Sequence, residues 1–395
     1  MNKLKNIGIS ALAGTLVSLS AAQAGGVSVS GVYELSYTNL NHNETAGNKL
    51  GVKKNISFGA GGDISDGGAV TWSSNIGWTD GADLSSASLA INMGGIATLT
   101  YDSGGGGTGA NAVDNIVPTA WEEVDYGLST GISDVGAVSA SKGVINLTVK
   151  APVAGTGVSL SYASRMSASH QADGAVGDGD DGHAGIDLVV DFVDYDAAHA
   201  GFRWGIAGQL ELPEVHCDRI KKDLGDVATC GDGLKHEPYA GTMFTKLQLG
   251  PVHLGTQATF QNLATTKADA IMNKRSIVAG GSLVFGDTLS VSYGEAWDKY
   301  RYNNACRGGD NADYQPYNAL SSIVSEQAKC GGLDLTGRGG EYETIRYRGI
   351  SAAWNIGPVA LKGTKNRVYG AGEGAGSDGE DNSKSHSEIN LSIAF

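Results

Sequence analysis

The chain ends on the stretch His386-Ser387-Glu388-Ile389-Asn390-Leu391-Ser392-Ile393-Ala394-Phe395, in which every second residue from Ile389 onward is apolar. A period of two is typical of a β-strand that has one apolar face and one polar face. The stretch therefore predicts a strand over 386–395 that ends at the last residue. The rest of the chain decides what kind of sheet this strand completes.

The amino terminus has the features of an export signal. Lys3 and Lys5 precede an apolar stretch, and Ala22-Gln23-Ala24 is a small-residue cleavage site. We expect residues 1–24 to be a signal peptide and the mature chain to begin at Gly25. No later window approaches the roughly 20 apolar residues that a membrane helix needs. The mature chain is therefore either a soluble secreted protein or a closed β-barrel.

The composition favours many turns and an acidic surface. There are 60 Gly but only 7 Pro and 4 Cys, and the formal net charge of −14 becomes −16 when Lys3 and Lys5 are removed. So acidic a chain is a poor partner for nucleic acid. The acidic loop 167–184 could bind Ca²⁺, but its spacing fits no EF-hand and a flexible loop is the favoured interpretation. We expect no cofactor and no metal site.

The four cysteines form two local pairs, Cys217 with Cys230 and Cys306 with Cys330. Export would place them in an oxidising compartment, where such pairs form disulfides. A zinc site is the alternative, because two histidines flank the first pair, but zinc ligands are usually closer together in the sequence. Disulfides are favoured, and of the three connectivities that four cysteines allow, the local one is preferred.

Fifteen further strand-like segments precede the closing one. In the sequence, long and short connections between them alternate without exception, as in outer-membrane barrels with long external loops and short periplasmic turns. We therefore predict an all-β fold for residues 25–395, a closed 16-stranded antiparallel transmembrane barrel whose first and last strands pair. The fifteen segments are 27–39, 50–61, 70–79, 86–93, 96–102, 143–152, 157–166, 185–195, 200–212, 237–249, 252–263, 276–285, 288–297, 341–356 and 359–369.

The export signal, the sixteen segments, the alternating loops and the terminal Phe395 together resemble the Gram-negative trimeric general porins. The resemblance implies a homotrimer in the bacterial outer membrane, in contact with outer-membrane lipid and lipopolysaccharide. It also implies a water-filled channel through which small hydrophilic solutes and ions diffuse passively. We expect the chain not to be an enzyme.

In that family the third long loop folds back into the barrel and narrows the pore. The matching stretch here is 103–142, which contains no Lys or Arg between 102 and 141. The resemblance therefore predicts that this loop carries an acidic constriction, which would give a mild preference for cations. The acidic residues assigned to the constriction are Asp114, Glu122, Glu123 and Asp125.

In that family an electric field crosses the pore. If this chain shares the arrangement, the pore wall opposite the acidic loop should be basic. A residue is expected to face the lumen when it lies on the strand face opposite the apolar one. Beyond Arg348 the apolar residues change parity, so we expect a β-bulge near Gly349. The predicted basic wall residues are Lys53, Arg165, Arg203, Lys246, Arg346 and Arg348.

Two other classes of protein were weighed against the channel. An outer-membrane barrel enzyme of the lipase or protease type would need a nucleophile, a base and an orienting acid close together, and no motif nominates them. A soluble secreted adhesin or surface-layer protein could also be rich in β-strands. Such a protein would not be expected to have all its long loops at one end of the sheet and all its short turns at the other.

Overall fold

The structure of the chain is a computed structural model, and it describes fourteen stretches of the sequence. The predicted signal peptide, Arg165, the four cysteines and nearly all of the acidic loop 167–184 lie outside them, so these predictions stay untested. The described residues are 26–41, 49–65, 67–80, 84–103, 107–128, 134–151, 155–164, 184–196, 200–212, 237–263, 271–286, 288–302, 342–369 and 384–395.

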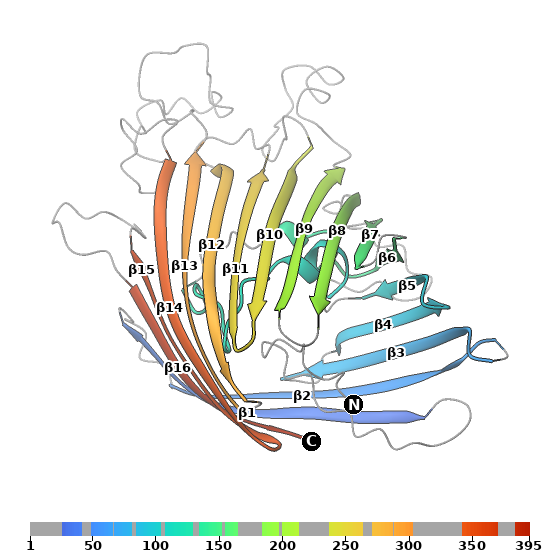
Figure 1. Ribbon diagram of the computed structural model, residues 1–395, viewed down its shortest axis with the longest axis horizontal. Helices are drawn as coiled ribbons and strands as arrows, with labels where there is room; N and C mark the ends of the chain where they lie inside the picture. The colour runs from blue at the N-terminus through green and yellow to red at the C-terminus, as the bar shows by residue number, and fades with distance from the viewer. Residues whose placement is uncertain are drawn as a thin grey trace, which may run out of the picture.

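The strands of the described residues form one closed barrel of sixteen antiparallel strands, as predicted. Each strand pairs with its neighbours in sequence, and Figure 1 shows them in chain order around the wall. The strands are β1 (Val27–Asn41), β2 (Leu50–Asp63), β3 (Val70–Thr79), β4 (Leu84–Met93), β5 (Ala97–Asp102), β6 (Val144–Lys150), β7 (Thr156–Ala163), β8 (Ala184–Asp196), β9 (Ala200–Leu212), β10 (Tyr239–Leu249), β11 (Val252–Asn262), β12 (Ile271–Phe285), β13 (Leu289–Tyr302), β14 (Tyr342–Ile356), β15 (Val359–Tyr369) and β16 (Lys384–Ala394).

The barrel is apolar outside and polar inside. In β16, Ile389 and Leu391 are 59% and 40% exposed, whereas Asn390 and Ser392 between them are 4% and 0% exposed. A soluble protein would bury the apolar face, because that burial drives its folding. The opposite arrangement fits a wall whose outer face meets lipid and whose inner face meets the lumen.

The first and last strands close the barrel. Leu35 lies opposite Leu391 in the β1–β16 pair, as the period of two predicts. Beyond β16, the backbone N–H of Phe395 donates to the carbonyl of Gly31 at 3.0 Å, and the N–H of Gly31 donates to the carbonyl of Phe395 at 2.8 Å. A Cβ at position 31 would collide with the Phe395 ring and with the carbonyl oxygen of Asn55. Only glycine therefore lets the terminal ring lie against β1.

The connections separate by length with one exception. The chain leaves β5 and β13 for its two longest connections at one end of the barrel, and short turns such as 250–251 and 357–358 lie at the other. The prediction of strict alternation is wrong for the first hairpins, since the β2–β3 turn (64–69) is longer than the β3–β4 loop (80–83). The predicted strand limits already contained this exception, since they leave eight residues in 62–69 and only six in 80–85.

The predicted β-bulge near Gly349 is wrong. Gly349 pairs with Gly294 on β13 and with Asn366 on β15, and neither register shifts there. Without an extra residue the faces cannot exchange, so Arg346 and Arg348 lie on the same face as Ile350. Separately, none of the helices among the described residues has the length and apolar character needed to cross a membrane.

We predict that Gly31→Val destabilises the closed barrel. The new side chain overpacks the Phe395 ring, which costs typically about 1–3 kcal/mol. The free energy of unfolding in urea, followed by the altered gel migration of the folded barrel, measures the effect. Gly26→Val is the control, because a Cβ there has no neighbour within 4 Å. Equal stability of the two variants would contradict the prediction.

Candidate functional site: a loop inside the barrel

The connection between β5 and β6 runs through the interior of the barrel. Its described residues are 103, 107–128 and 134–143, and they include the short 3-10 helices η1 (Gly109–Val113) and η2 (Asp134–Gly136). In Figure 1 this teal segment lies beside the ribbons of β8 to β11. Its helix η1 contacts β7 to β9, and its helix η2 contacts β9 to β11. We call residues 107–128 and 134–141 the inner loop.

The first part of the inner loop is tied to β8 and β11. The backbone N–H of Ala110 donates to Asp187 Oδ1 at 3.3 Å. Gln257 accepts from the N–H of Ile116 at 3.1 Å and donates through Nε2 to the carbonyl of Val113 at 2.9 Å. Gly109 has φ of 54°, and a Cβ there would collide with side-chain oxygens of Ser161 and Asp187. Glycine at 109 thus permits the close approach to β8.

The second part is tied to β13, β14 and β15 by three polar side chains. Ser292 Oγ accepts from the N–H of Ala120 at 2.8 Å, and Ser351 Oγ accepts from the N–H of Trp121 at 3.2 Å. Asn366 Nδ2 donates to the carbonyls of Glu123 and Tyr126, both at 3.0 Å. The inward polar side chains of the wall therefore satisfy backbone groups of the inner loop that would otherwise be buried without partners.

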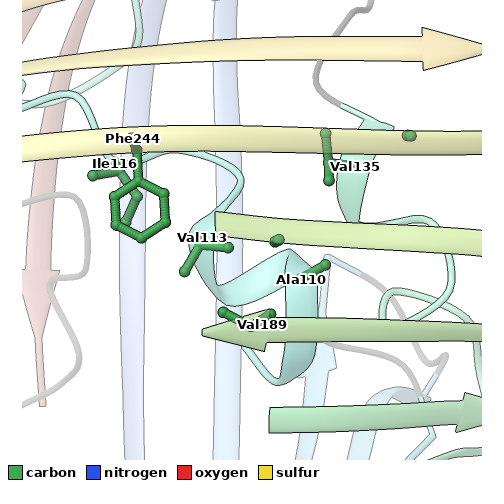
Figure 2. Packing of buried hydrophobic residues seen from close by; sticks show 8 residues of the cluster. Ala110, Val113, Ile116, Val135, Val189 and Phe244 are labelled. Carbon is green, nitrogen blue, oxygen red and sulfur yellow. The ribbon is translucent and has the colours of Figure 1, made fainter. Parts of the chain in front are cut away.

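Apolar contacts hold the same loop at two places. Figure 2 shows the first, where Ala110, Val113, Ile116 and Val135 of the loop pack against Phe244 and other wall residues. At the second, Val124 packs against a cluster that includes the fully buried Tyr347. Burial of these side chains favours the inward position of the loop, since apolar area is removed from water.

The middle of the loop meets charged residues of β1, β15 and β16. The ammonium group of Lys362 lies 5.7 Å from the ring centre of Trp121 and 3.2 Å from Glu34 Oε1. The rings of Tyr126 and His386 meet edge to face at 5.3 Å. The loop is thus anchored on both sides of the acidic sequence 122–125.

All four acidic residues that the sequence assigned to the constriction line one pocket. Asp114, Glu122, Glu123 and Asp125 share it with inward residues of β11 to β15, among them Asp298. About 770 Å³ of space that no protein atom fills, open solvent included, lies between these residues. In the described part of the chain, no three His, Cys, Asp or Glu side chains are placed to hold a metal ion.

Burial raises the pKa of each of the three carboxyls in the sequence 122–125. The pKa of Glu123 rises to about 8, first because of burial and then because of the nearby charges of Asp125, Glu122 and Asp114. For Glu122, burial and Glu388 raise the pKa, while Lys362 and Lys53 lower it. Burial likewise raises the pKa of Asp125. The charge of this group is therefore set by its surroundings.

Three of the predicted basic residues face inward. Lys53 lies opposite Glu34 in the β1–β2 pair and is close enough to act on Glu122. Arg203 of β9 makes a bidentate ion pair with Asp191, with Nη2 and Oδ2 2.6 Å apart. Lys246 of β10 lies opposite Arg203. Of these three residues, only Lys53 lowers the pKa of a carboxyl in the acidic sequence 122–125, namely that of Glu122.

Arg346 and Arg348 are wrongly predicted as wall residues of the lumen. Their outward direction follows from the unbroken register, and both form ion pairs with Glu295, which lies on the outer face of β13. The prediction failed because it took Ile345 and Tyr347, which alternate with the two arginines, for the outer apolar face, whereas both are buried and pack with Val124 of the inner loop. A charge can also stay on the outer face near the end of a strand, where the apolar band ends.

Several inward residues were missed by the sequence interpretation. Lys362 is inward by the same parity rule, since its neighbours Leu361 and Gly363 lie on the outer face, and it could have been found. Most residues that hydrogen-bond the backbone of the loop (Gln257, Ser292, Ser351 and Asn366) are uncharged, so no charge singled them out, and Asp187 is the exception. The missed residues that contact or act on the inner loop are Asp187, Gln257, Ser292, Ser351, Lys362, Asn366, His386 and Glu388.

The fold defines the class of this chain: it is a closed 16-stranded antiparallel β-barrel with an apolar outer face, which is the architecture of outer-membrane barrels. No protein-family model matches the sequence, and no curated protein matches it.

Solved structures of outer-membrane proteins share the fold. OmpT of Vibrio cholerae in its trimer form has 10% identity and a TM-score of 0.58, and the match covers 94% of this chain and 100% of that chain. An anion-selective porin from Comamonas acidovorans has 11% identity and a TM-score of 0.52, with coverage of 94% and 100%. At such identities the similarity concerns the fold, and at that level the resemblance to the general porins is confirmed.

The prediction that the chain is not an enzyme is overturned by this comparison. Several of the similar structures bear the name OmpT, which is also the name of an outer-membrane protease. The name brings an enzyme into consideration beside the porins. The exclusion of enzymatic function is therefore withdrawn.

We predict that the double variant Ser292→Ala, Ser351→Ala loosens the inner loop. Two hydrogen bonds of about 1 kcal/mol each are lost, so the amides of Ala120 and Trp121 should exchange hydrogen roughly tenfold faster or more. Exchange rates of these amides measure the effect. Ser290→Ala is the matched control, because Ser290 is inward on β13 and its hydroxyl has no partner among the described residues. Unchanged exchange in the double variant would show that the two hydroxyls do not hold the loop.

Proposed function

We propose that this chain forms a water-filled channel for the passive diffusion of small hydrophilic solutes and ions across the outer membrane. The channel is narrowed by the loop 103–142, whose Asp114, Glu122, Glu123 and Asp125 form its acidic constriction. The observation that carries the proposal is the attachment of the inner loop to polar residues of six strands. The proposed passage runs along the side of the loop that carries none of these attachments.

The channel prefers cations mildly. In a confined lumen the effective dielectric constant is lower than in bulk water, so a few carboxylates bias ion entry. The inward cations that oppose them are partly neutralised, since Arg203 pairs with Asp191 and Lys362 pairs with Glu34. Arg346 and Arg348 lie on the outer face and so do not offset the acidic loop from the lumen.

The channel assembles as a homotrimer. The support is the OmpT of V. cholerae, which shares the fold and whose structure is that of a trimer form. The outward faces of β3 to β7 are suited to contact between barrels, because their described side chains include no Lys or Arg.

We predict that the triple variant Glu122→Gln, Glu123→Gln, Asp125→Asn shifts the reversal potential of the channel toward anions. The substitutions remove three carboxyl groups from the constriction, while the hydrogen bonds of the loop backbone remain. Reversal potentials in planar bilayers with a salt gradient measure the shift. Asp194→Asn is the control, since Asp194 lies opposite Phe202 on the outer face of the barrel. If the triple variant keeps the selectivity and conductance of the wild type, these residues do not line the constriction.

We also predict that the cation preference grows with pH. The pKa of Glu123 is raised from 4.5 to about 8, so its carboxyl gains charge as the pH rises through about 8. Stability changes in the opposite direction to the cation preference. Because the pKa of Glu123 is higher in the folded protein than in the unfolded chain, the packed loop is most stable below pH 4.5 and loses stability as the pH rises through 8. Reversal potentials from about pH 6 to about pH 10 test this. Glu123→Gln should flatten the profile, and a step that survives this substitution belongs to another group.

A further inference from the structure

Four glycines form a row across the inner wall of the barrel, one on each of the strands β11 to β14. In the β11–β12 pair, Gly255 lies opposite Gly280. Gly294 of β13 lies opposite Gly280 on one side and opposite Gly349 of β14 on the other. Figure 1 shows these strands side by side, so the row crosses the wall at one height. We call these four residues the glycine row.

The first end of the glycine row carries the inner loop directly. A Cβ at position 255 would lie 2.5 Å from Cδ of Pro118, and a Cβ at position 280 would lie 3.1 Å from Cγ1 of Val117. Pro118 is buried at this contact. Glycine in a strand often marks a place where another segment approaches the backbone closely, and here that segment is the loop.

The other end of the row carries Val124, which is 7% exposed. A Cβ at position 349 would lie 3.0 Å from Cα of Val124, and a Cβ at position 294 would lie 3.7 Å from its Cβ. None of the four glycines has a positive φ, so the backbone conformation does not require glycine at these positions. The missing side chains instead form a groove in the wall, and the inner loop fills it.

Larger residues border the groove on both sides and hold the loop there. On the long-loop side, Gln257 binds the loop backbone and Tyr347 packs in the cluster that contains Val124. On the short-turn side, Ser292 and Ser351 each accept a hydrogen bond from a loop amide. The loop is therefore held against sliding up or down the wall, and a loop displaced from the groove moves toward the lumen.

We infer that the glycine row sets the width of the passage and, with it, the size of the solutes that pass. Because the groove holds no side chains of the wall, the loop lies closer to the wall and leaves more of the lumen open. The four glycines are positioning residues, since they act through the inner loop. The inference rests on the proposed channel and adds to it the residues that determine its size limit.

The test fills the groove with Gly255→Ala, because the loop is the main obstacle to a side chain at this position. The nearest wall atom to the new methyl group, the carbonyl oxygen of Thr245, lies 3.3 Å away. Carbon atoms pack best at about 3.5–4.0 Å, so the methyl group displaces the Pro118 ring by about 1 Å or more.

Swelling of liposomes that contain the purified full-length protein measures the size limit. The probes are the monosaccharide arabinose and the trisaccharide raffinose. Selectivity depends on pore diameter, so Gly255→Ala should lower the rate for raffinose relative to arabinose at least roughly twofold.

A second substitution separates an effect on the groove from a general defect of the strand. Pro118→Ala removes the ring atoms that the methyl group at position 255 would meet, so the double variant should recover the sugar ratio of the wild type. Pro118→Ala alone completes the double-mutant cycle. Gly208→Ala is the matched control and should keep the wild-type ratio. It lies on the outer face of β9, where the nearest atom to a Cβ is 3.7 Å away.

Hydrogen exchange reports whether the loop has moved. The N–H of Ile116 donates to Gln257 two residues before Pro118, and it should exchange roughly tenfold faster in Gly255→Ala. If this variant does not fold, Gly294→Val fills the other end of the groove. Its γ carbons meet Val124, and Val124→Ala is then the rescuing substitution.

Three results would overturn the inference and leave the channel standing. They are a wild-type sugar ratio in Gly255→Ala, a lowered ratio that Pro118→Ala does not restore, and faster exchange at Ile116 with an unchanged ratio. A failure of the proposed channel is a different result, because neither sugar would then enter liposomes that contain the wild-type protein. That result would end the channel proposal and this inference together.

Discussion

The structure depends on one constraint, which is that every peptide group within the lipid must find its hydrogen-bond partner inside the barrel. A sheet with a free edge cannot meet this constraint, so the first and last strands must pair. The β1–β16 pair and the two backbone hydrogen bonds between Gly31 and Phe395 complete that closure. The alternation of faces follows, because closure gives each strand one side toward lipid and one toward the lumen.

The inner face uses its polar residues twice. Ser, Asn and Gln keep the lumen compatible with water, and the same side chains bind the backbone of the inner loop. Ser292 and Ser351 even hydrogen-bond each other at 2.7 Å while each accepts from a loop amide. A loop without regular secondary structure can thus lie against the wall with its buried backbone groups satisfied. Its position then fixes where its carboxylates lie and how strongly burial raises their pKa values.

The sequence predicted the strands well because a period of two is a local signal. The closing strand, the β1–β16 pairing and the limits of β9 and β15 follow directly from it. The contacts of the inner loop could not be predicted in the same way. Asp187 is 77 residues from Ala110, and Asn366 is 243 residues from Glu123, so no local pattern joins them. For the loop, the resemblance to a family indicated the region, whereas the residues that hold it were found only in the folded chain.

The error at Arg346 and Arg348 shows what period-two patterns leave open. The pattern shows which residues share a face of the strand. It does not show which of the two faces is the outer one and which faces the lumen. Alternation with Ile345 and Tyr347 suggested that the arginines face the lumen, but the exposed Ile350 and Trp354 lie on the same face as the arginines and identify it as the outer one. Once the face is correct, the charges of the chain separate into two groups. Acidic residues of the inner loop face the interior, while Arg and Lys collect on the outer face of β12 to β15. The formal net charge of −14 hides this separation, since it sums charges that the wall of the barrel keeps apart.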